Sequence, residues 1–393
     1  MINRKKLDPR KIQLFFDVTA KTLSSFCCLN VKKINIMATS ILSINPKLYS
    51  TEIAVSKNDD IFYHYEIEHS NDDLILFENL VEQIPFRRDA IMNQLRKDNI
   101  NIKELNYVVA EGGLLRPCQS GVYAIDKNMV GDLLDGIAGD DIINLGGLLA
   151  FTVANSLRIK SLVVEPASVD ERSELASFTT HPSLRKKSLF HALIHKYLSK
   201  RYASDVKKNY EDLNIIFCHV NERSVSVAAH KKGKVVDVNQ AYMGFGPMGF
   251  CEIGTLPVSA INDMLFKKCY SKDEMLKLVK TNGTSFSYLG TNSINEIIKL
   301  FENNDKKTKQ MLEAMAYQIS KEIVSHYVSL DAQIDAIILS GEIFSAKRFF
   351  KYISKRIEKL APIVTYPKDY TFEAMVFNVL QVENKKEEIK TYV

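Results

Sequence analysis

The sequence has no long apolar run and no cysteine pair spaced for a metal. None of its apolar stretches approaches the ~20 residues that a membrane-spanning helix needs. Its six cysteines form no CxxC pair, and no histidine accompanies them at the spacing of a zinc site. In a chain of 393 residues, this use of cysteine is typical of reduced thiols in a cytosolic protein. We therefore expect a cytoplasmic protein without a membrane partner.

An excess of basic charge is absent outside the N-terminal segment. Residues 1–36 hold eight Lys and Arg against Asp8 and Asp17, a net charge of +6, whereas the remaining residues carry a net charge of −1. A near-neutral body gives no sign of a nucleic-acid surface, so we expect no nucleic-acid partner. The segment also lacks the uninterrupted apolar stretch of a secretory signal, and Met37 directly precedes the first predicted strand. We interpret residues 1–36 as a basic extension that is disordered or not in the mature protein.

Helices and strands alternate along the rest of the chain. The composition, 46% hydrophobic and 25% charged, is that of a globular protein, and the length allows two domains of ~100–200 residues. Recurring apolar positions predict helices at 74–98, 128–134, 143–157, 183–204, 258–266, 272–280, 293–302, 307–329, 346–359 and 372–383. Short apolar runs between them are typical of buried strands. The pattern predicts an α/β fold with an N-terminal lobe at 37–205 and a C-terminal lobe at 206–393.

One pattern of strand, polar hairpin, strand, charged turn and strand occurs twice. Its strands span 41–46, 51–55 and 61–67 in the first copy, and 214–220, 224–229 and 235–238 in the second. In two-lobed kinases built on a duplicated actin/hexokinase-like (ribonuclease H-like) domain, such hairpins wrap the phosphates of a nucleotide. Glycine at the hairpin tip lets backbone N–H groups approach phosphate oxygens closely. Here the tips read Lys47-Leu48-Tyr49 and Asn221-Glu222-Arg223, without glycine. The repeat predicts this duplicated fold with altered phosphate contacts.

A series of short motifs gives the chain a family resemblance from about Ser40 to Tyr392. The motifs are Ile44-Asn45-Pro46 with Ser50-Thr51, His69-Ser70, Gly112-Gly113-Leu114-Leu115-Arg116-Pro117, Lys187-Ser188-Leu189-Phe190-His191-Ala192-Leu193, Arg201-Tyr202-Ala203, Ala229-His230-Lys231-Lys232-Gly233-Lys234-Val235, Gly254-Thr255-Leu256-Pro257, Leu289-Gly290-Thr291-Asn292 and Met315-Ala316-Tyr317-Gln318. In this order, nearly end to end, they resemble butyrate kinase, a short-chain carboxylate kinase related to acetate kinase.

The resemblance implies a reaction, its cofactors and its site residues. It implies reversible transfer of the ATP γ-phosphoryl group to a short-chain fatty acid such as butyrate, with Mg²⁺, by a homodimer whose C-terminal lobe binds the nucleotide. Such catalysis depends on positioning and on neutralising the charge of the transferred group. By family position, the expected catalytic residues are Glu165, His191 and His219, and the expected cofactor-binding residues are Asn45, Ser50, Thr51, Asn221, Gly290 and Gly341. No residue is assigned to a metal.

Both hairpin loops depart from the family pattern. In the first loop, Lys47, Leu48 and Glu52 replace a glycine, a serine and a closing lysine. In the second loop, His219 is kept, but Asn221-Glu222-Arg223 stands where three glycines are expected. Side chains with a Cβ restrict backbone approach and positive φ angles. We therefore expect weaker phosphate binding by both loops.

Two expected arginines are replaced by glutamates, Glu111 and Glu252, and the late loop carries Glu342 in place of a glycine. Loss of a phosphate-facing arginine can cost ~10³-fold or more in rate. A glutamate in its place repels an anionic substrate. These changes predict weak or lost activity. The alternative is a non-catalytic binding or regulatory protein that pairs with an active paralogue in a heterodimer.

Several side chains have two interpretations from the sequence. Lys47 and Arg223 are either solvated loop charges or cations that replace the lost backbone contacts. His191 and His219 are either site residues beside the phosphoryl group or structural histidines. Asp170, Glu171 and Asp237 are either site carboxylates or structural residues. The lysines of one predicted helix form either an anion-binding surface or, as we favour, a solvated helical face; they are Lys186, Lys187, Lys196 and Lys200.

Overall fold

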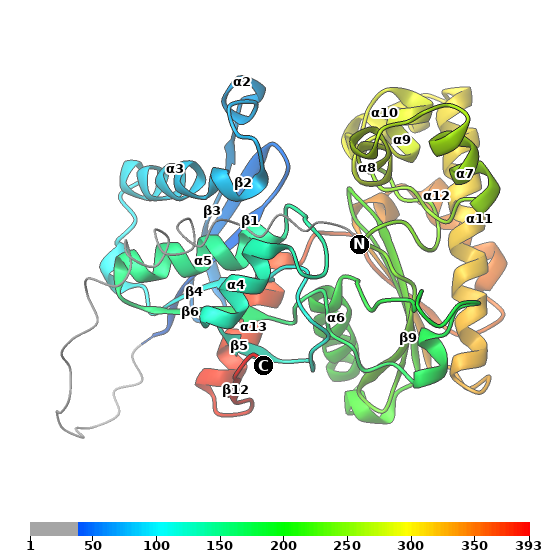
Figure 1. The fold of residues 1–393 in the computed structure, drawn as a ribbon. Coiled ribbons are helices and arrows are strands. Elements are labelled where there is room, and N and C mark those ends of the chain that lie inside the picture. Colours follow the sequence, from blue (N-terminus) through cyan, green and yellow to red (C-terminus); the bar gives the residue numbers. More distant parts are fainter. Residues whose placement is uncertain (1–37) are drawn as a thin grey trace. The chain divides into compact units, whose positions relative to one another are not determined.

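The chain divides into two compact units whose boundaries differ from the predicted lobes. The computed structural model describes residues 38–393, so the interpretation of residues 1–36 lies outside the described residues. The first unit runs up to Ser168 and takes in Thr371–Val393, and the second unit is Val169–Tyr370. The boundary therefore lies at Ser168 rather than at residue 205, and the last helix returns to the first unit (Figure 1).

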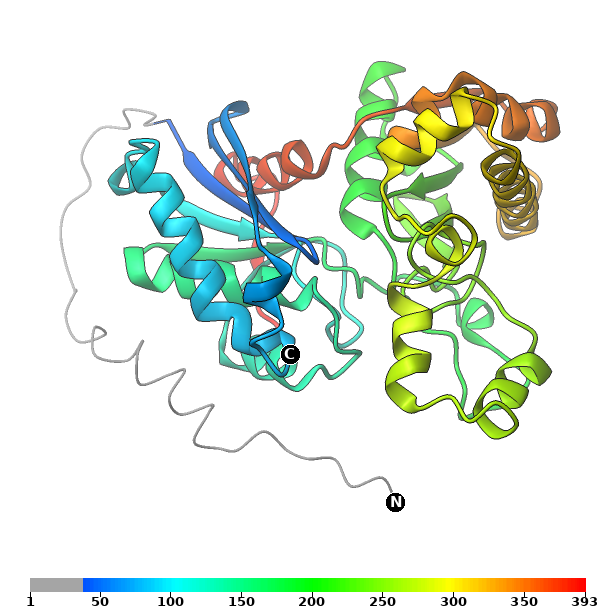
Figure 2. The ribbon, with the colours of Figure 1, turned by 90° about the horizontal axis from the view of Figure 1, so that it is seen from above.

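The first unit is built on a seven-stranded sheet in the order β12-β5-β6-β4-β1-β2-β3. Its strands are β1 (Ser40–Pro46), β2 (Ser50–Lys57), β3 (Asp60–Glu68), β4 (Tyr107–Ala110), β5 (Val122–Ala124), β6 (Lys160–Val164) and β12 (Ile389–Lys390). Its helices are α2 (Asn71–Leu74), α3 (Ile84–Lys97), α4 (Lys127–Asp135), α5 (Asn144–Leu157) and α13 (Thr371–Glu383). The sheet lies between α13 on one side and α3 and α5 on the other (Figure 2), so its central strands are buried on both faces.

The second unit is built on a five-stranded sheet in the order β11-β10-β7-β8-β9. Its strands are β7 (Ile215–Val220), β8 (Val225–Lys231), β9 (Lys234–Val238), β10 (Ala336–Ser340) and β11 (Ile363–Tyr366). Its helices are α6 (Ala192–Asp205), α7 (Val258–Phe266), α8 (Lys272–Lys280), α9 (Thr284–Leu289), α10 (Ile294–Glu302), α11 (Lys306–Ser329) and α12 (Lys347–Ile357). Helix α11 packs on β7, β8 and β9, and α6 packs on β7.

The two sheets share one topology, which confirms the predicted duplication. The order β3-β2-β1-β4-β6 in the first unit corresponds to β9-β8-β7-β10-β11 in the second. In each unit the first three strands are antiparallel and the next two run parallel to the first. Each hairpin also closes with the same turn, since the N–H of Lys47 donates to the carbonyl of Ser50 (2.9 Å) and that of Asn221 to the carbonyl of Ser224 (3.3 Å). The fold is a duplicated, two-lobed actin/hexokinase-like fold.

Local signals place most helix ends correctly. Helix α4 begins where the side chain of Asp126 accepts from the N–H of Met129 and ends at Gly136 with φ +57°. Two predicted helices start too early. The helix predicted from residue 74 begins at Ile84, followed by Pro85 in its first turn, because the preceding residues form α2 and a short 3₁₀ segment. The helix predicted from residue 183 begins at Ala192.

No helix within residues 38–393 combines the length and apolar character needed to cross a membrane. The four cysteines in this part of the chain, Cys118, Cys218, Cys251 and Cys269, are free thiols. Burial raises the pKa of the Cys218 thiol, which keeps it protonated.

Candidate active site

The turn of the first hairpin is held by a buried arginine that the sequence analysis did not single out. Arg87 on α3 is fully buried, and its guanidinium donates to the carbonyl oxygens of Lys47 (3.0 Å), Leu48 (3.0 Å) and Ser50 (2.7 Å). It also donates to the hydroxyl of Thr51 (2.9 Å). These bonds turn the carbonyls of the loop inward. In the sequence Arg87 is followed by Arg88, so it resembled one more charged residue of an exposed helix face.

The first hairpin also contains a charge pair made by two of its unusual residues. Lys47 Nζ lies 3.1 Å from a carboxylate oxygen of Glu52, and the amide of Asn45 donates to the other oxygen at 3.0 Å. The side chain of Glu52 is only 9% exposed, so this pair is largely shielded from water. The interpretation of Lys47 as a solvated loop charge is therefore wrong. The cation that replaces glycine neutralises the anion that replaces lysine.

The predicted nucleotide-binding hydroxyls of this hairpin take part in hydrogen bonds within the first unit. Ser50 donates to Glu66 (2.6 Å), and Thr51 Oγ1 lies 2.8 Å from His69 Nε2. Burial and the nearby Arg87 guanidinium lower the pKa of His69 from 6.5 to about 4, so this imidazole is neutral at pH 7. The structure thus brings Asn45, Ser50 and Thr51 together around one turn, each bonded to protein.

Glu165, the predicted catalytic carboxylate of the first unit, lies immediately after β6. It is fully buried with φ +41°, a left-handed conformation that is uncommon for glutamate. Its carboxylate accepts from the hydroxyl of Ser120 (2.9 Å) and the N–H of Gly121 (3.1 Å). The side chain therefore fixes the loop before β5, and its catalytic role stays a prediction.

In the second unit, the hairpin turn uses a side chain where the family pattern has glycine. The carboxamide oxygen of Asn221 accepts from the backbone N–H groups of Arg223 (2.8 Å) and Ser224 (2.9 Å). Successive N–H groups of this kind form the concave site that binds phosphate oxygens in glycine loops. Here the oxygen of Asn221 occupies that position. The turn as it stands does not fit a phosphate, because its donors are already satisfied.

A second charge pair stands beside this turn. The guanidinium of Arg223 donates to Glu252 at 2.7 Å, and the other carboxylate oxygen accepts from the N–H of Met243 at 2.9 Å. The side chains of Arg223 and Glu252 are 9% and 2% exposed. As in the first hairpin, a cation gained in the loop pairs with a glutamate that replaces an expected cation. The predicted repulsion by Glu252 is thus offset within the second unit.

His191 and His219 lie next to one another, with ring centroids 4.9 Å apart. Nε2 of His191 lies 3.0 Å from the amide nitrogen of Asn221 and its Nδ1 lies 2.7 Å from the hydroxyl of Ser226. His219 Nδ1 lies 3.2 Å from the hydroxyl of Ser340. Burial lowers the pKa of His191 well below 6.5 and that of His219 to about 4. The structure therefore brings His191 and His219 together as buried, neutral imidazoles, with the half-buried Asn221 beside His191.

The two predicted glycines of the second unit have different surroundings. Gly341 follows β10 with φ +122°, and a Cβ there would lie 1.9 Å from the carbonyl oxygen of Val220. Gly290 ends α9 with φ +75° and has open space around it. Only Gly341 is required by close packing, beside the end of β7 where His219 lies. Glu342, the third substituted position, opens a short 3₁₀ segment and is exposed.

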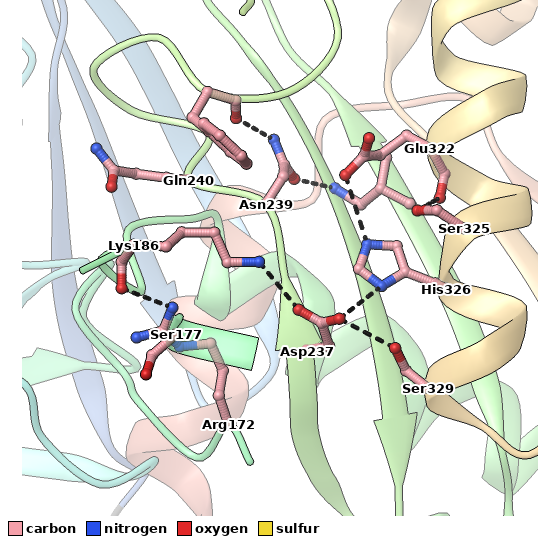
Figure 3. Close-up of polar contacts among 12 residues, drawn as sticks. Arg172, Ser177, Lys186, Asp237, Asn239, Gln240, Glu322, Ser325, His326 and Ser329 are labelled. Carbon is pink, nitrogen blue, oxygen red and sulfur yellow. Dashed lines mark hydrogen bonds and ion pairs between the residues drawn. The ribbon is translucent and has the colours of Figure 1, made fainter. Parts of the chain in front are cut away.

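The acidic residues that had two interpretations are engaged in ion pairs. Asp237 on β9 binds Lys186 (3.1 Å) and the hydroxyl of Ser329 (3.0 Å), and lies 3.7 Å from His326 (Figure 3). Glu171 binds Lys196 of α6. The side chain of Lys196 is 2% exposed, so its assignment to a solvated helical face is wrong.

Figure 3 shows that Asp237 connects the Lys186 segment to α11, since His326 and Ser329 both lie on that helix. Within residues 38–393, no three histidine, cysteine or acidic side chains converge as metal ligands. Mg²⁺ in kinases is held by one or two carboxylates together with phosphates and water, so a converging set of three is not what this ion requires. The observed contacts of Asp237 are structural, because they join the Lys186 segment to α11.

The comparisons with known proteins agree with the fold and the motifs. A model of the acetokinase family matches residues 176–358. The chain is 37% identical over 356 residues to butyrate kinase 2 of Clostridium acetobutylicum, which covers 91% of this chain and 100% of that protein. It is 35% identical, with the same coverage, to a probable butyrate kinase of Clostridium botulinum.

Among solved structures, acetate kinase of Porphyromonas gingivalis matches with a TM-score of 0.68 at 14% identity, covering 87% of this chain and 98% of that one. A propionate kinase of Francisella tularensis matches with a TM-score of 0.68 at 13% identity, covering 86% and 98% of the two chains. At this identity the structures support the fold alone. The full-length sequence matches decide the family, and the chain belongs to the acetokinase family, where its sequence is similar to butyrate kinases.

Proposed function

We propose that this protein is a short-chain carboxylate kinase of the butyrate kinase type, which transfers the γ-phosphoryl group of ATP to butyrate or a similar fatty acid. The observation that carries the proposal is the end-to-end sequence match to butyrate kinases, which spans both duplicated units. When bound, Mg²⁺ would neutralise charge on the transferred phosphoryl group. The proposal includes a cytoplasmic location and a homodimer. Light scattering of the purified chain tests the homodimer.

We further propose that turnover is low, because the turn of the second hairpin is closed to phosphate. Asn221 occupies the N–H groups of the turn, and Arg223 is paired with Glu252. A phosphate bound there has to displace the carboxamide and compete for the guanidinium. No observation within residues 38–393 or in the comparisons favours the alternative of a non-catalytic partner of a paralogue.

The test is formation of acyl phosphate from butyrate, ATP and Mg²⁺, trapped as hydroxamate, by purified residues 37–393. We expect measurable product at a kcat at least about tenfold below the ~1–100 s⁻¹ of ordinary kinases. A folded chain that forms no product above the enzyme-free blank would contradict the kinase proposal. Turnover within the ordinary range would contradict the closed turn.

A paired variant separates the two parts of the proposal. Arg223→Gly with Glu252→Arg restores the family residue types and changes the net charge of the pair from 0 to +1, as the control below also does. We expect it to raise kcat/KM by about tenfold or more, since the arginine then has no glutamate partner. Lys267→Gly with Asp263→Arg, an exposed pair on and after α7, is the matched control and is expected to leave activity unchanged.

A further inference from the structure

Three buried histidines of the second unit form one continuous chain of hydrogen bonds that begins at the hairpin turn. From Asn221 the chain passes to His191 (3.0 Å), through the hydroxyl of Ser226 (2.7 Å and 2.7 Å) to His195, then to His230 (3.2 Å) and to the hydroxyl of Tyr210 (2.7 Å). All of these side chains except Asn221 are at most 5% exposed. Two longer contacts flank the chain, from Ser224 to His191 and from Ser199 to His230, both 3.3 Å.

The direction of the chain is decided at Asn221. Its carboxamide oxygen is identified by the two backbone N–H groups that donate to it, those of Arg223 and Ser224. The amide nitrogen therefore faces Nε2 of His191. An amide nitrogen is a donor only, so Nε2 of His191 has to be the acceptor and carries no proton.

Each later link follows from the one before. Burial lowers the pKa of His191, His195 and His230 well below 6.5, and a neutral imidazole has one donor and one acceptor nitrogen. With Nε2 accepting, His191 donates from Nδ1 to Ser226. The Ser226 hydroxyl then donates to Nε2 of His195, which donates from Nδ1 to Nε2 of His230. His230 in turn donates from Nδ1 to the hydroxyl of Tyr210.

We propose that Asn221 is a positioning residue that sets His191, His195 and His230 in the Nδ1–H tautomer. The importance of this for catalysis rests on the proposed function, in which His191 lies beside the phosphoryl group. Phosphate oxygens only accept hydrogen bonds, and His191 offers them a lone pair while Asn221 is in place. Phosphate binding at Nε2 therefore requires Asn221 to leave and every proton of the chain to shift, with Tyr210 becoming the terminal donor.

The first test is the tautomer of the wild-type protein without substrate. Long-range ¹H–¹⁵N spectra of ¹⁵N-histidine-labelled protein distinguish protonated from unprotonated ring nitrogens. The protein has eight histidines, and single His→Gln substitutions assign their signals. We expect Nδ1–H at His191, His195 and His230, and Nε2–H at any of the three would overturn the proposal. Because no turnover is measured, a failed kinase assay leaves this result intact.

The second test reverses the chain with a substitution of nearly equal size. In Asn221→Asp the outer oxygen accepts, so Nε2 of His191 becomes the donor and all three histidines are expected to change to Nε2–H. Retention of Nδ1–H at His195 and His230 would show that Asn221 does not set the direction.

The control is Asn304→Asp, the same substitution elsewhere in the second unit. Asn304 accepts a hydrogen bond from Arg348 and lies outside the hydrogen-bond chain. The tautomers of His191, His195 and His230 are therefore expected to remain as in the wild type. A change of tautomer in the control would attribute the effect to charge alone and overturn the proposal.

Discussion

At the scale of single residues, the buried arginine beneath the first hairpin stabilises the loop through carbonyl groups. Arg87→Lys removes the planar set of donors that reaches the carbonyls of Lys47, Leu48 and Ser50. Buried acceptors left without donors cost about 1–3 kcal/mol each, so we expect a loss of about 3 kcal/mol in the free energy of unfolding. Urea denaturation measures it. Arg88→Lys, at a partly exposed neighbour paired with Asp89, is the control and should change stability by less than about 0.5 kcal/mol.

The neutral histidine under the same hairpin predicts a loss of stability in acid. Burial holds the pKa of His69 at about 4 in the folded chain against 6.5 ordinarily, so between these values the unfolded chain binds more protons. Stability is fully present above pH 6.5 and falls by up to ~1.4 kcal/mol per pH unit as the pH drops toward 4. We expect His69→Gln to remove about 2 kcal/mol of the stability difference between pH 7 and pH 5.

Urea denaturation at the two pH values measures this difference. His181→Gln, at an exposed histidine, is the matched control for loss of an imidazole. An unchanged pH dependence in His69→Gln would mean that this imidazole is not held neutral in the folded chain.

At the scale of the helices and strands, two glycines that were predicted to share one role have different surroundings. Gly341→Ala places a Cβ 1.9 Å from the carbonyl of Val220 at φ +122°, and we expect it to cost about 4 kcal/mol or more. Gly290→Ala meets open space at φ +75° and should cost only about 1 kcal/mol, the ordinary penalty of a left-handed helix end. Thermal unfolding compares the two variants. Equal losses would contradict the close approach of β10 and β7.

The strands and helices were largely predictable because their signals are local. The helices α7 and α8 match the predicted bounds, since helical periodicity depends on neighbouring residues. The charge pairs were not predictable. Lys47 with Glu52 and Arg223 with Glu252 each looked like a loop cation and a misplaced anion, and only the geometry of the turns brings each pair together.

At the scale of the whole molecule, the sequence predicted the duplication and the fold but placed the division between the two units wrongly. Local signals do not show where a chain returns to an earlier sheet. Helix α13 buries Phe372, Met375 and Val379 and packs on β1, β4, β5 and β6, more than two hundred residues earlier in the chain. The site residues were assigned by family position, while the contacts that determine their state, such as the Arg87 bonds, involve residues outside any motif.

The division into units predicts which pieces of the chain fold alone. The segment 169–370 contains a complete sheet and its own apolar core, so we expect it to unfold cooperatively by itself. The segment 38–168 lacks α13, which packs on its central strands, and β12, which pairs with β5. It also lacks Tyr392, whose hydroxyl donates to Asp132 (2.8 Å), so we expect it to be unfolded or aggregated.

Joining 371–393 to the end of 38–168 through a flexible linker is the matched control, and we expect it to restore cooperative unfolding. Circular dichroism and urea denaturation of the three fragments decide the question. A folded 38–168 would contradict the division, because the late helix would then be an addition to a core that is already complete. A linked fragment that stays unfolded would contradict it equally, since it would show that the first unit depends on the second.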